Sequence, residues 1–128
     1  SPTPIVGPDR GSKSDNHANA GFAHEGNQIR RFMATQKNAF IICGDRHWQY
    51  VSIDNTTSVK EFSCGPTSDA HAGGWKQSTR LPEHQYLNVK GGFLWVAVSR
   101  ANGIPTIKAS HCGVTGEIYN EDISIAEQ

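Results

Sequence analysis

A short apolar run at residues 39–43 limits the possible folds more than any other segment of this 128-residue chain. Five consecutive apolar residues lead directly into Gly44 and Asp45, where a polar stretch begins. The run is far shorter than the roughly 20 residues of a membrane-spanning helix. Its length and sharp end predict instead a strand buried on both faces, which is typical of the centre of an α/β sheet.

A short amphipathic helix is expected before this strand, at about residues 24–36. Three of its apolar residues recur at helical spacing and predict one buried stripe: Ile29, Phe32 and Met33. Only two polar residues separate the helix from the apolar run. We therefore expect Phe32 to pack with Ile41 and Ile42, either directly or against the same sheet.

Most of the remaining chain is expected to form strands and loops. The expected strands are residues 48–54, 59–64, 93–100, 106–111 and 116–119. The first two resemble a hairpin, and Asn102-Gly103 between the third and fourth is a strong signal for another. Residues 1–21 and the long polar stretch 65–82 are expected to be loops. One helix cannot cover both faces of such a sheet, so part of the domain is expected to lie outside this sequence.

The charges of the chain are balanced, with 12 Lys and Arg residues against 12 Asp and Glu residues. No long basic run is present, so neither a nucleic acid nor a membrane surface is an expected partner. The three cysteines, Cys43, Cys64 and Cys112, stand far apart and form neither a CxxC pair nor a dense disulfide pattern. We expect them to be small packing residues, since free cysteine is among the most buried residue types.

The segment Gly44-Asp45-Arg46-His47 carries the clearest chemical signal. It follows the expected buried strand, and open α/β sheets place ligand-handling residues at such strand ends. In an extended or tightly turned segment Asp45 and His47 point to the same side, and carboxylate and imidazole groups are suitable ligands for Zn, Fe or Mn. The alternative is that Asp45 caps a turn and that His47 is an ordinary surface residue.

Two further residues are candidates for substrate binding. Arg46 could bind a phosphate through two parallel hydrogen bonds. Its side chain is expected to point away from Asp45 and His47, so the alternative is a salt bridge under the sheet. His71, in the polar loop, could reach a substrate at the rim of a cleft, although an exposed loop histidine without a function is the commoner case.

Several blocks of the sequence occur in an order that resembles the C-terminal part of PhoD-like (alkaline phosphatase D) phosphatases. The blocks are residues 3–10, 15–19, 44–50, 61–66 and 91–94, which together span nearly the whole chain. This family belongs to the calcineurin-like metallophosphoesterase superfamily, whose fold is a four-layer sandwich with two β-sheets inside and helices outside. The resemblance implies an α/β fold in which this chain is the β-rich C-terminal part of that sandwich, with one main helix. It also implies a metal-dependent phosphatase that hydrolyses phosphate mono- or diesters through a two-metal centre.

The same resemblance assigns candidate metal ligands. The last metal motif of the superfamily is Gly-His-x-His, and the matching block here has Asp45 in place of the first histidine. His47 is thus an expected ligand, and Asp45 is an expected oxygen ligand that favours a harder ion. Asp15 and His17 lie where the family has another polar ligand, and their alternative is a solvated turn. The implied cofactors are two divalent or trivalent metal ions, drawn from Fe, Ca, Mn or Zn.

The early blocks of the superfamily, including a Gly-Asn-His motif, have no counterpart in this sequence. They supply most ligands of the first metal, so we expect an N-terminal half of the same domain before Ser1 and an inactive isolated segment. Two alternatives stay open: a non-catalytic β-rich binding module with structural Asp45 and His47, and a hydrolase with a single metal. That single metal would be held by Asp15, His17, Asp45 and His47. Family members are often exported, which favours a periplasmic or extracellular location.

Overall fold

The structure is a computed structural model that describes residues 1–124 of the chain. Within this range the helical segments are η1 (Ala20–Phe22), α1 (Ala23–Ala34) and η2 (Asp69–His71), of which only α1 is an α-helix. The strands are β1 (Ile41–Cys43), β2 (Gln49–Ile53), β3 (Lys60–Ser63), β4 (His84–Asn88), β5 (Phe93–Ala101), β6 (Ile104–Gly113) and β7 (Gly116–Ser124). They build a four-stranded sheet in the order β1-β3-β2-β4 and a three-stranded sheet in the order β5-β6-β7.

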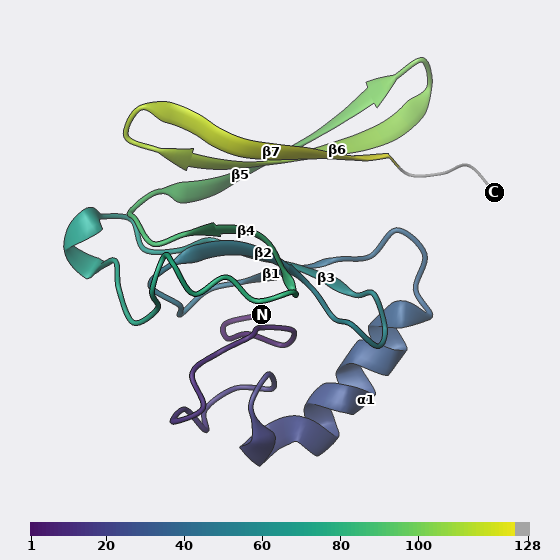
Figure 1. Ribbon diagram of the computed structural model, residues 1–128. Helices are drawn as coiled ribbons and strands as arrows, with labels where there is room; N and C mark the ends of the chain where they lie inside the picture. The colour runs from purple at the N-terminus through teal and green to yellow at the C-terminus, as the bar shows by residue number, and fades with distance from the viewer. Residues whose placement is uncertain (125–128) are drawn as a thin grey trace.

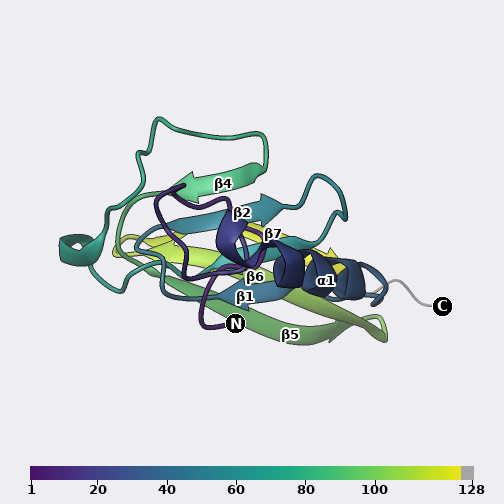
Figure 2. The same cartoon turned by 90° about the horizontal axis from the view of Figure 1, so that it is seen from below.

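The two sheets lie one above the other and enclose an apolar core (Figure 1). Buried Val51 and Phe62 of the four-stranded sheet pack with Ala109 of the three-stranded sheet. Partly buried hydrophobic side chains surround this centre: Phe40, Tyr86, Leu94, Tyr119 and Ile123. Helix α1 and the N-terminal segment, residues 1–22, lie on the opposite side of the four-stranded sheet (Figures 1 and 2). The described part of the chain is therefore β-rich, with two sheets and one main helix.

Both predicted hairpins are confirmed. Strands β2 and β3 pair antiparallel, and so do β5 and β6. The turn between β5 and β6 holds Asn102 and Gly103 at φ values of 54° and 84°, a left-handed conformation that Asn and Gly tolerate well. The last strand, β7, extends beyond the predicted residues 116–119. Strand β4, which pairs antiparallel with β2, was not predicted.

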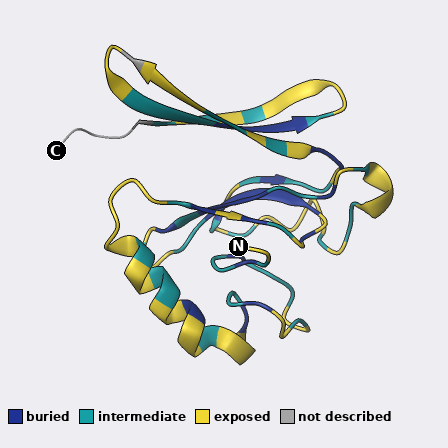
Figure 3. Ribbon diagram, turned by 180° about the vertical axis from the view of Figure 1, so that it is seen from behind, coloured by how far each residue is buried: buried dark blue, intermediate teal, exposed yellow. Residues whose placement is uncertain are grey.

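The prediction that residues 39–43 form a strand buried on both faces is wrong. Strand β1 lies at the edge of its sheet, where its one neighbour is β3. Its burial alternates, with Ile41 7% exposed and Ile42 37% exposed. Strands β2 and β3 are the ones buried on both faces, because both lie inside the sheet and have a layer on each side (Figure 3). An apolar run thus identified a strand correctly but not its place in the sheet.

The predicted buried stripe on the helix is also wrong. Phe32 is 63% exposed, and Gly26 is the one buried residue of α1. The helix packs against the N-terminal segment rather than flat on the sheet: a Cβ atom added to Gly26 would lie 2.1 Å from the carbonyl oxygen of His17. Arg30 reinforces this contact, because it donates a hydrogen bond to that same oxygen at 3.1 Å and forms an ion pair with Asp54 at 3.4 Å. The helix is therefore held by a close backbone approach at Gly26 and by the polar contacts of Arg30, and not by an apolar stripe.

Candidate functional site

Burial alternates along the segment that follows β1. Asp45 and His47 are exposed, whereas Arg46 between them is 3% exposed and Trp48 is fully buried. Asp45 adopts a positive φ of 66°, an uncommon conformation for a residue other than glycine. Asp45 and His47 both line the cleft described next, but Arg46 lines it too and contacts Asp45, so the expected orientation of Arg46 away from these residues is wrong.

A cleft of about 440 Å³ lies beside this segment. Its lining includes Asp15, Asp45, Arg46, His47 and His71, which are all the predicted site residues except His17. The loop that begins with η2 forms another wall, and the N–H of Gly73 donates a hydrogen bond to the carbonyl oxygen of His47 at 3.0 Å. The ring centroids of His47 and His71 lie 6.4 Å apart. The structure thus brings residues from three separate segments of the chain to one place.

Two cations that the sequence did not single out also line this cleft. Arg10 and Lys13 come from the N-terminal segment, and both side chains are partly exposed. The guanidinium carbon of Arg10 lies 5.2 Å above the ring of Trp48, a cation–π geometry that fixes its position. Lys13 lies 3.8 Å from a carboxylate oxygen of Asp15. The cleft therefore combines exposed carboxylate and imidazole groups with cationic groups.

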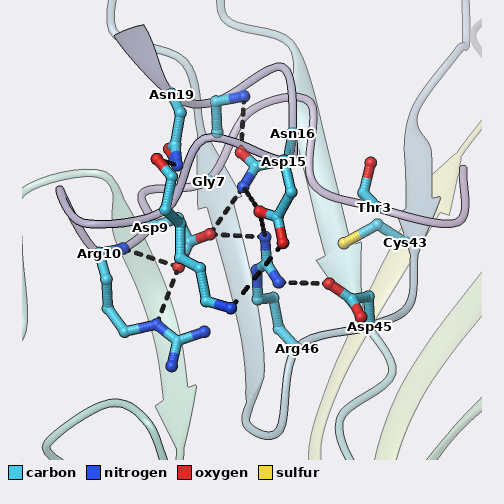
Figure 4. Close-up of polar contacts among 12 residues, drawn as sticks. Thr3, Gly7, Asp9, Arg10, Asp15, Asn16, Asn19, Cys43, Asp45 and Arg46 are labelled. Atoms are coloured by element: carbon cyan, nitrogen blue, oxygen red, sulfur yellow. Dashed lines mark hydrogen bonds and ion pairs between the residues drawn. The ribbon is translucent and has the colours of Figure 1, made fainter. Parts of the chain in front are cut away.

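The guanidinium group of Arg46 is held by three carboxylates (Figure 4). Its Nη2 atom lies 2.7 Å from Asp9 and 3.0 Å from Asp15, and its Nη1 atom contacts Asp45. The side chain of Asp9 is fully buried and also accepts a 2.8 Å hydrogen bond from the side-chain amide of Asn16. Arg46 thus forms the salt bridges that were the alternative to phosphate binding, and it ties the N-terminal segment to the loop after β1.

The ionisation of Asp15 follows from this network. A 3.0 Å hydrogen bond from the Asn16 side chain is the largest cause that lowers the pKa of Asp15, and Arg46 and Lys13 lower it further. Partial loss of hydration acts in the opposite direction. Asp15 therefore faces the cleft as a carboxylate at neutral pH.

Glu61 is a polar anchor of the site that the sequence analysis missed. It is fully buried, and its carboxylate accepts hydrogen bonds from the backbone N–H groups of Ile5, Val6 and Gly7 at 2.7, 3.1 and 3.0 Å. The hydroxyl of Tyr50 donates a fourth bond at 2.7 Å. Burial and the neighbouring carboxylate keep the pKa of Tyr50 well above its ordinary value. This anchor fixes the start of the segment that carries the cleft's Arg10 and Lys13.

His17 is the predicted ligand that the structure places elsewhere. Its Nε2 atom lies 3.1 Å from Glu25, and its ring stands beside Phe22, with the centroids 5.9 Å apart. The structure therefore does not bring Asp15, His17, Asp45 and His47 together in the way that the single-metal alternative requires. The reason is the turn at residues 15–19, which directs His17 toward α1 rather than toward the cleft.

The cleft offers side chains of the type that bind metal ions, but too few of them lie close together to form a complete metal site. Asp45 and His47 offer an oxygen and a nitrogen donor of the right kind. Among residues 1–124, however, no three His, Cys, Asp or Glu side chains are grouped so that they could hold a metal ion. Catalytic zinc sites, for comparison, use about three protein ligands. The described residues alone do not form a complete metal centre.

The three cysteines are free thiols. Cys43 and Cys112 are buried, and Cys64 is half-buried. Burial is the main cause that raises the pKa values of Cys43 and Cys64. Their assignment as packing residues agrees with these surroundings, and none of them lines the cleft.

None of the α-helical residues described forms a segment with the length and apolarity required to cross a bilayer. In comparisons with known proteins, no protein-family model, no curated protein and no solved structure matches this chain.

Proposed function

We propose that this chain is the C-terminal part of a PhoD-like, metal-dependent phosphatase that hydrolyses phosphate mono- or diesters. The observation that carries the proposal is the cleft beyond β1, where Asp45, His47 and His71 lie together with Arg10 and Lys13. Arg and Lys side chains bind phosphoryl oxygens, and carboxylate and imidazole groups bind the metals that such hydrolysis uses. The proposed substrate is a phosphate ester, and the proposed location is the periplasm or the extracellular space, by resemblance alone.

The proposed cofactors are two divalent or trivalent metal ions. When bound about 3.5–4 Å apart, such a pair neutralises phosphoryl charge and supplies a hydroxide at neutral pH. Asp45 and His47 would contribute two of the ligands. The other ligands would come from residues outside this chain, because the described residues lack a group of three.

The edge of β1 supports the proposal that more of the same domain packs here. Ser1 pairs with β1: its amino group donates to the carbonyl of Ile42 at 2.8 Å, and its carbonyl accepts from Gly44 at 3.3 Å. Ile42 itself is 37% exposed. An apolar edge strand is commonly covered in native proteins. We propose that an N-terminal half of the domain covers it and completes the four-layer sandwich.

The test uses the intact protein, expressed from its whole gene, and the variant His47→Ala. We expect metal content and release of phosphate from an ester to fall together, because His47 is the proposed ligand. His24→Ala is the matched control, since His24 is exposed on α1 and bonds to Gln28. Unchanged metal content and unchanged hydrolysis in His47→Ala would refute the assignment.

One observation favours a second candidate, a non-catalytic β-rich binding module. Asp45 is paired with Arg46, and Arg46 also binds Asp9 and Asp15, so Asp45 has a structural contact in addition to its proposed role as a ligand. In such a module, Asp45→Asn would lower the free energy of unfolding without any change in metal content. An intact parent protein that binds no metal and hydrolyses no ester would decide for this candidate.

A further inference from the structure

A second cavity, of about 420 Å³, adjoins the candidate site. Within residues 1–124, five residues line it: Arg10, Gly74, Trp75, Lys76 and Thr79. Arg10 and Gly74 also line the cleft, so the two cavities share a wall. The volume is within the range of about 300–1,000 Å³ that is typical of small-molecule sites. We call this second cavity the Trp75 cavity.

Trp75 is held in a fixed position at this cavity. Its indole N–H donates a 2.8 Å hydrogen bond to the carbonyl oxygen of Thr79. Its ring stacks on Trp48 with the centroids 5.5 Å apart and an interplanar angle of 27°. His84 contacts it edge-on, also at 5.5 Å between centroids. A rigid aromatic surface loses little side-chain entropy when a planar ligand stacks on it.

The remaining wall of the Trp75 cavity is cationic. Arg10 is fixed above Trp48, and its side chain is partly exposed. Lys76 is exposed beside Trp75. The described residues that line the cavity include no acidic one. An aromatic surface between two cations is complementary to a planar group that bears negative charge.

We propose that the Trp75 cavity binds the organic part of a phosphate ester, namely a planar ring with a second anionic group, while the phosphate lies in the adjoining cleft. The inference rests on the proposed function, because it places the phosphate beside Asp45 and His47. Arg10 lines both cavities and is thus positioned to contact the ester between its phosphate and its ring. Small aliphatic phosphate esters would leave the Trp75 cavity empty and bind more weakly.

The test measures binding of phosphonates, which resemble phosphate esters but are not hydrolysed, to the intact protein by calorimetry. The probes are methylphosphonate, phenylphosphonate and 4-carboxyphenylphosphonate. We expect the phenyl compound to bind about tenfold more tightly than the methyl compound, the usual order for stacking on an aromatic side chain. The carboxylate should strengthen binding further, and Lys76→Ala should remove that gain alone. Lys90→Ala is the matched control, because Lys90 is exposed and lines neither cavity.

A second measurement locates the ring. In protein labelled with ¹⁵N at tryptophan, phenylphosphonate should shift the indole signal that disappears in Trp75→Phe, and methylphosphonate should not. Equal affinities for the methyl and phenyl compounds would overturn the inference and leave the proposed phosphatase untouched. Binding of none of the three probes would also overturn it. Tight binding of the phenyl compound at Trp75 in a protein that hydrolyses no ester would support the cavity assignment and refute the proposed phosphatase function.

Discussion

His111 shows at the scale of one residue how burial is linked to pH. Its ring is fully buried, and Nε2 lies 2.8 Å from the carbonyl oxygen of Ser63, to which it donates. The other nitrogen, Nδ1, has no hydrogen-bond partner among the described residues. Burial lowers the pKa of His111, and the bond to Ser63 offsets part of that effect. Protonation would therefore place a second N–H group where nothing accepts it.

The first prediction is that the chain loses stability as the pH falls from 7.5 to 5.5. The folded pKa of His111 lies below the ordinary value of about 6.5, so the unfolded chain binds more protons in this range. The stabilising contribution is complete above about pH 6.5 and declines as the pH falls toward the folded pKa. Urea unfolding at several pH values measures it. His111→Gln, which keeps a donor for Ser63, should reduce the slope, and a remaining slope is expected because burial also lowers the pKa of His84.

The matched control is His24→Gln, the same substitution at an exposed histidine of α1. The carboxyl groups of Asp15 and Glu117 do not contribute to this pH dependence, because their pKa values are lowered from 3.8 and 4.5. Both groups therefore stay charged throughout the range. A free energy of unfolding that is constant between pH 7.5 and 5.5 would contradict the prediction.

At the scale of elements, β1 is the strand that was wrongly predicted to be buried on both faces. The second prediction compares its two isoleucines. Ile41→Ala should lower the free energy of unfolding by about 2–5 kcal/mol, because Ile41 is buried. Ile42→Ala should cost about 1 kcal/mol or less in this chain, because Ile42 is 37% exposed. Urea unfolding of the two variants provides the comparison within a single strand. A larger loss for Ile42 than for Ile41 would show that both faces of β1 are covered.

The elements that could be predicted are those with local causes. The turn at Asn102-Gly103 follows from the backbone freedom of these two residues. The position of β1 depends on pairing with β3, which an apolar run does not encode. Strand β4 was missed because its polar residues gave no apolar alternation.

Some features of the candidate site were also visible in the sequence, and others depend on the fold. Its Asp45-x-His47 spacing was visible in the sequence, and so was the loop around His71. The pairing of Arg46 with Asp9 joins residues far apart in the chain, and only the fold brings them together. A charged residue inside an expected strand, Glu61, was the one available signal for the buried anchor.

At the scale of the whole molecule, the two sheets are joined by polar contacts in addition to apolar contacts. Gln49 of β2 is fully buried, and its amide nitrogen lies 3.2 Å from the carbonyl oxygen of Cys112 and 3.4 Å from that of Phe93. Its amide oxygen accepts a 3.0 Å hydrogen bond from Asn88 of β4. One side chain of the four-stranded sheet is thus bonded to the start of β5 and the end of β6.

The last prediction is that Gln49→Leu loosens the three-stranded sheet more than the sheet to which Gln49 belongs. Leucine fills a similar volume but leaves the Cys112 carbonyl and the Asn88 amide without their partner, which costs about 1–3 kcal/mol for each buried group left unsatisfied. Because the strands of β5–β7 have long exposed stretches and one covered face, loss of this link should favour their local opening (Figure 3). Hydrogen exchange should therefore accelerate more for the amides of β5 and β6 than for those of β3. Gln85→Leu, an exposed substitution in β4, is the matched control and should change neither rate. An equal acceleration in both sheets would mean that they unfold as one cooperative unit and that Gln49 contributes only to global stability.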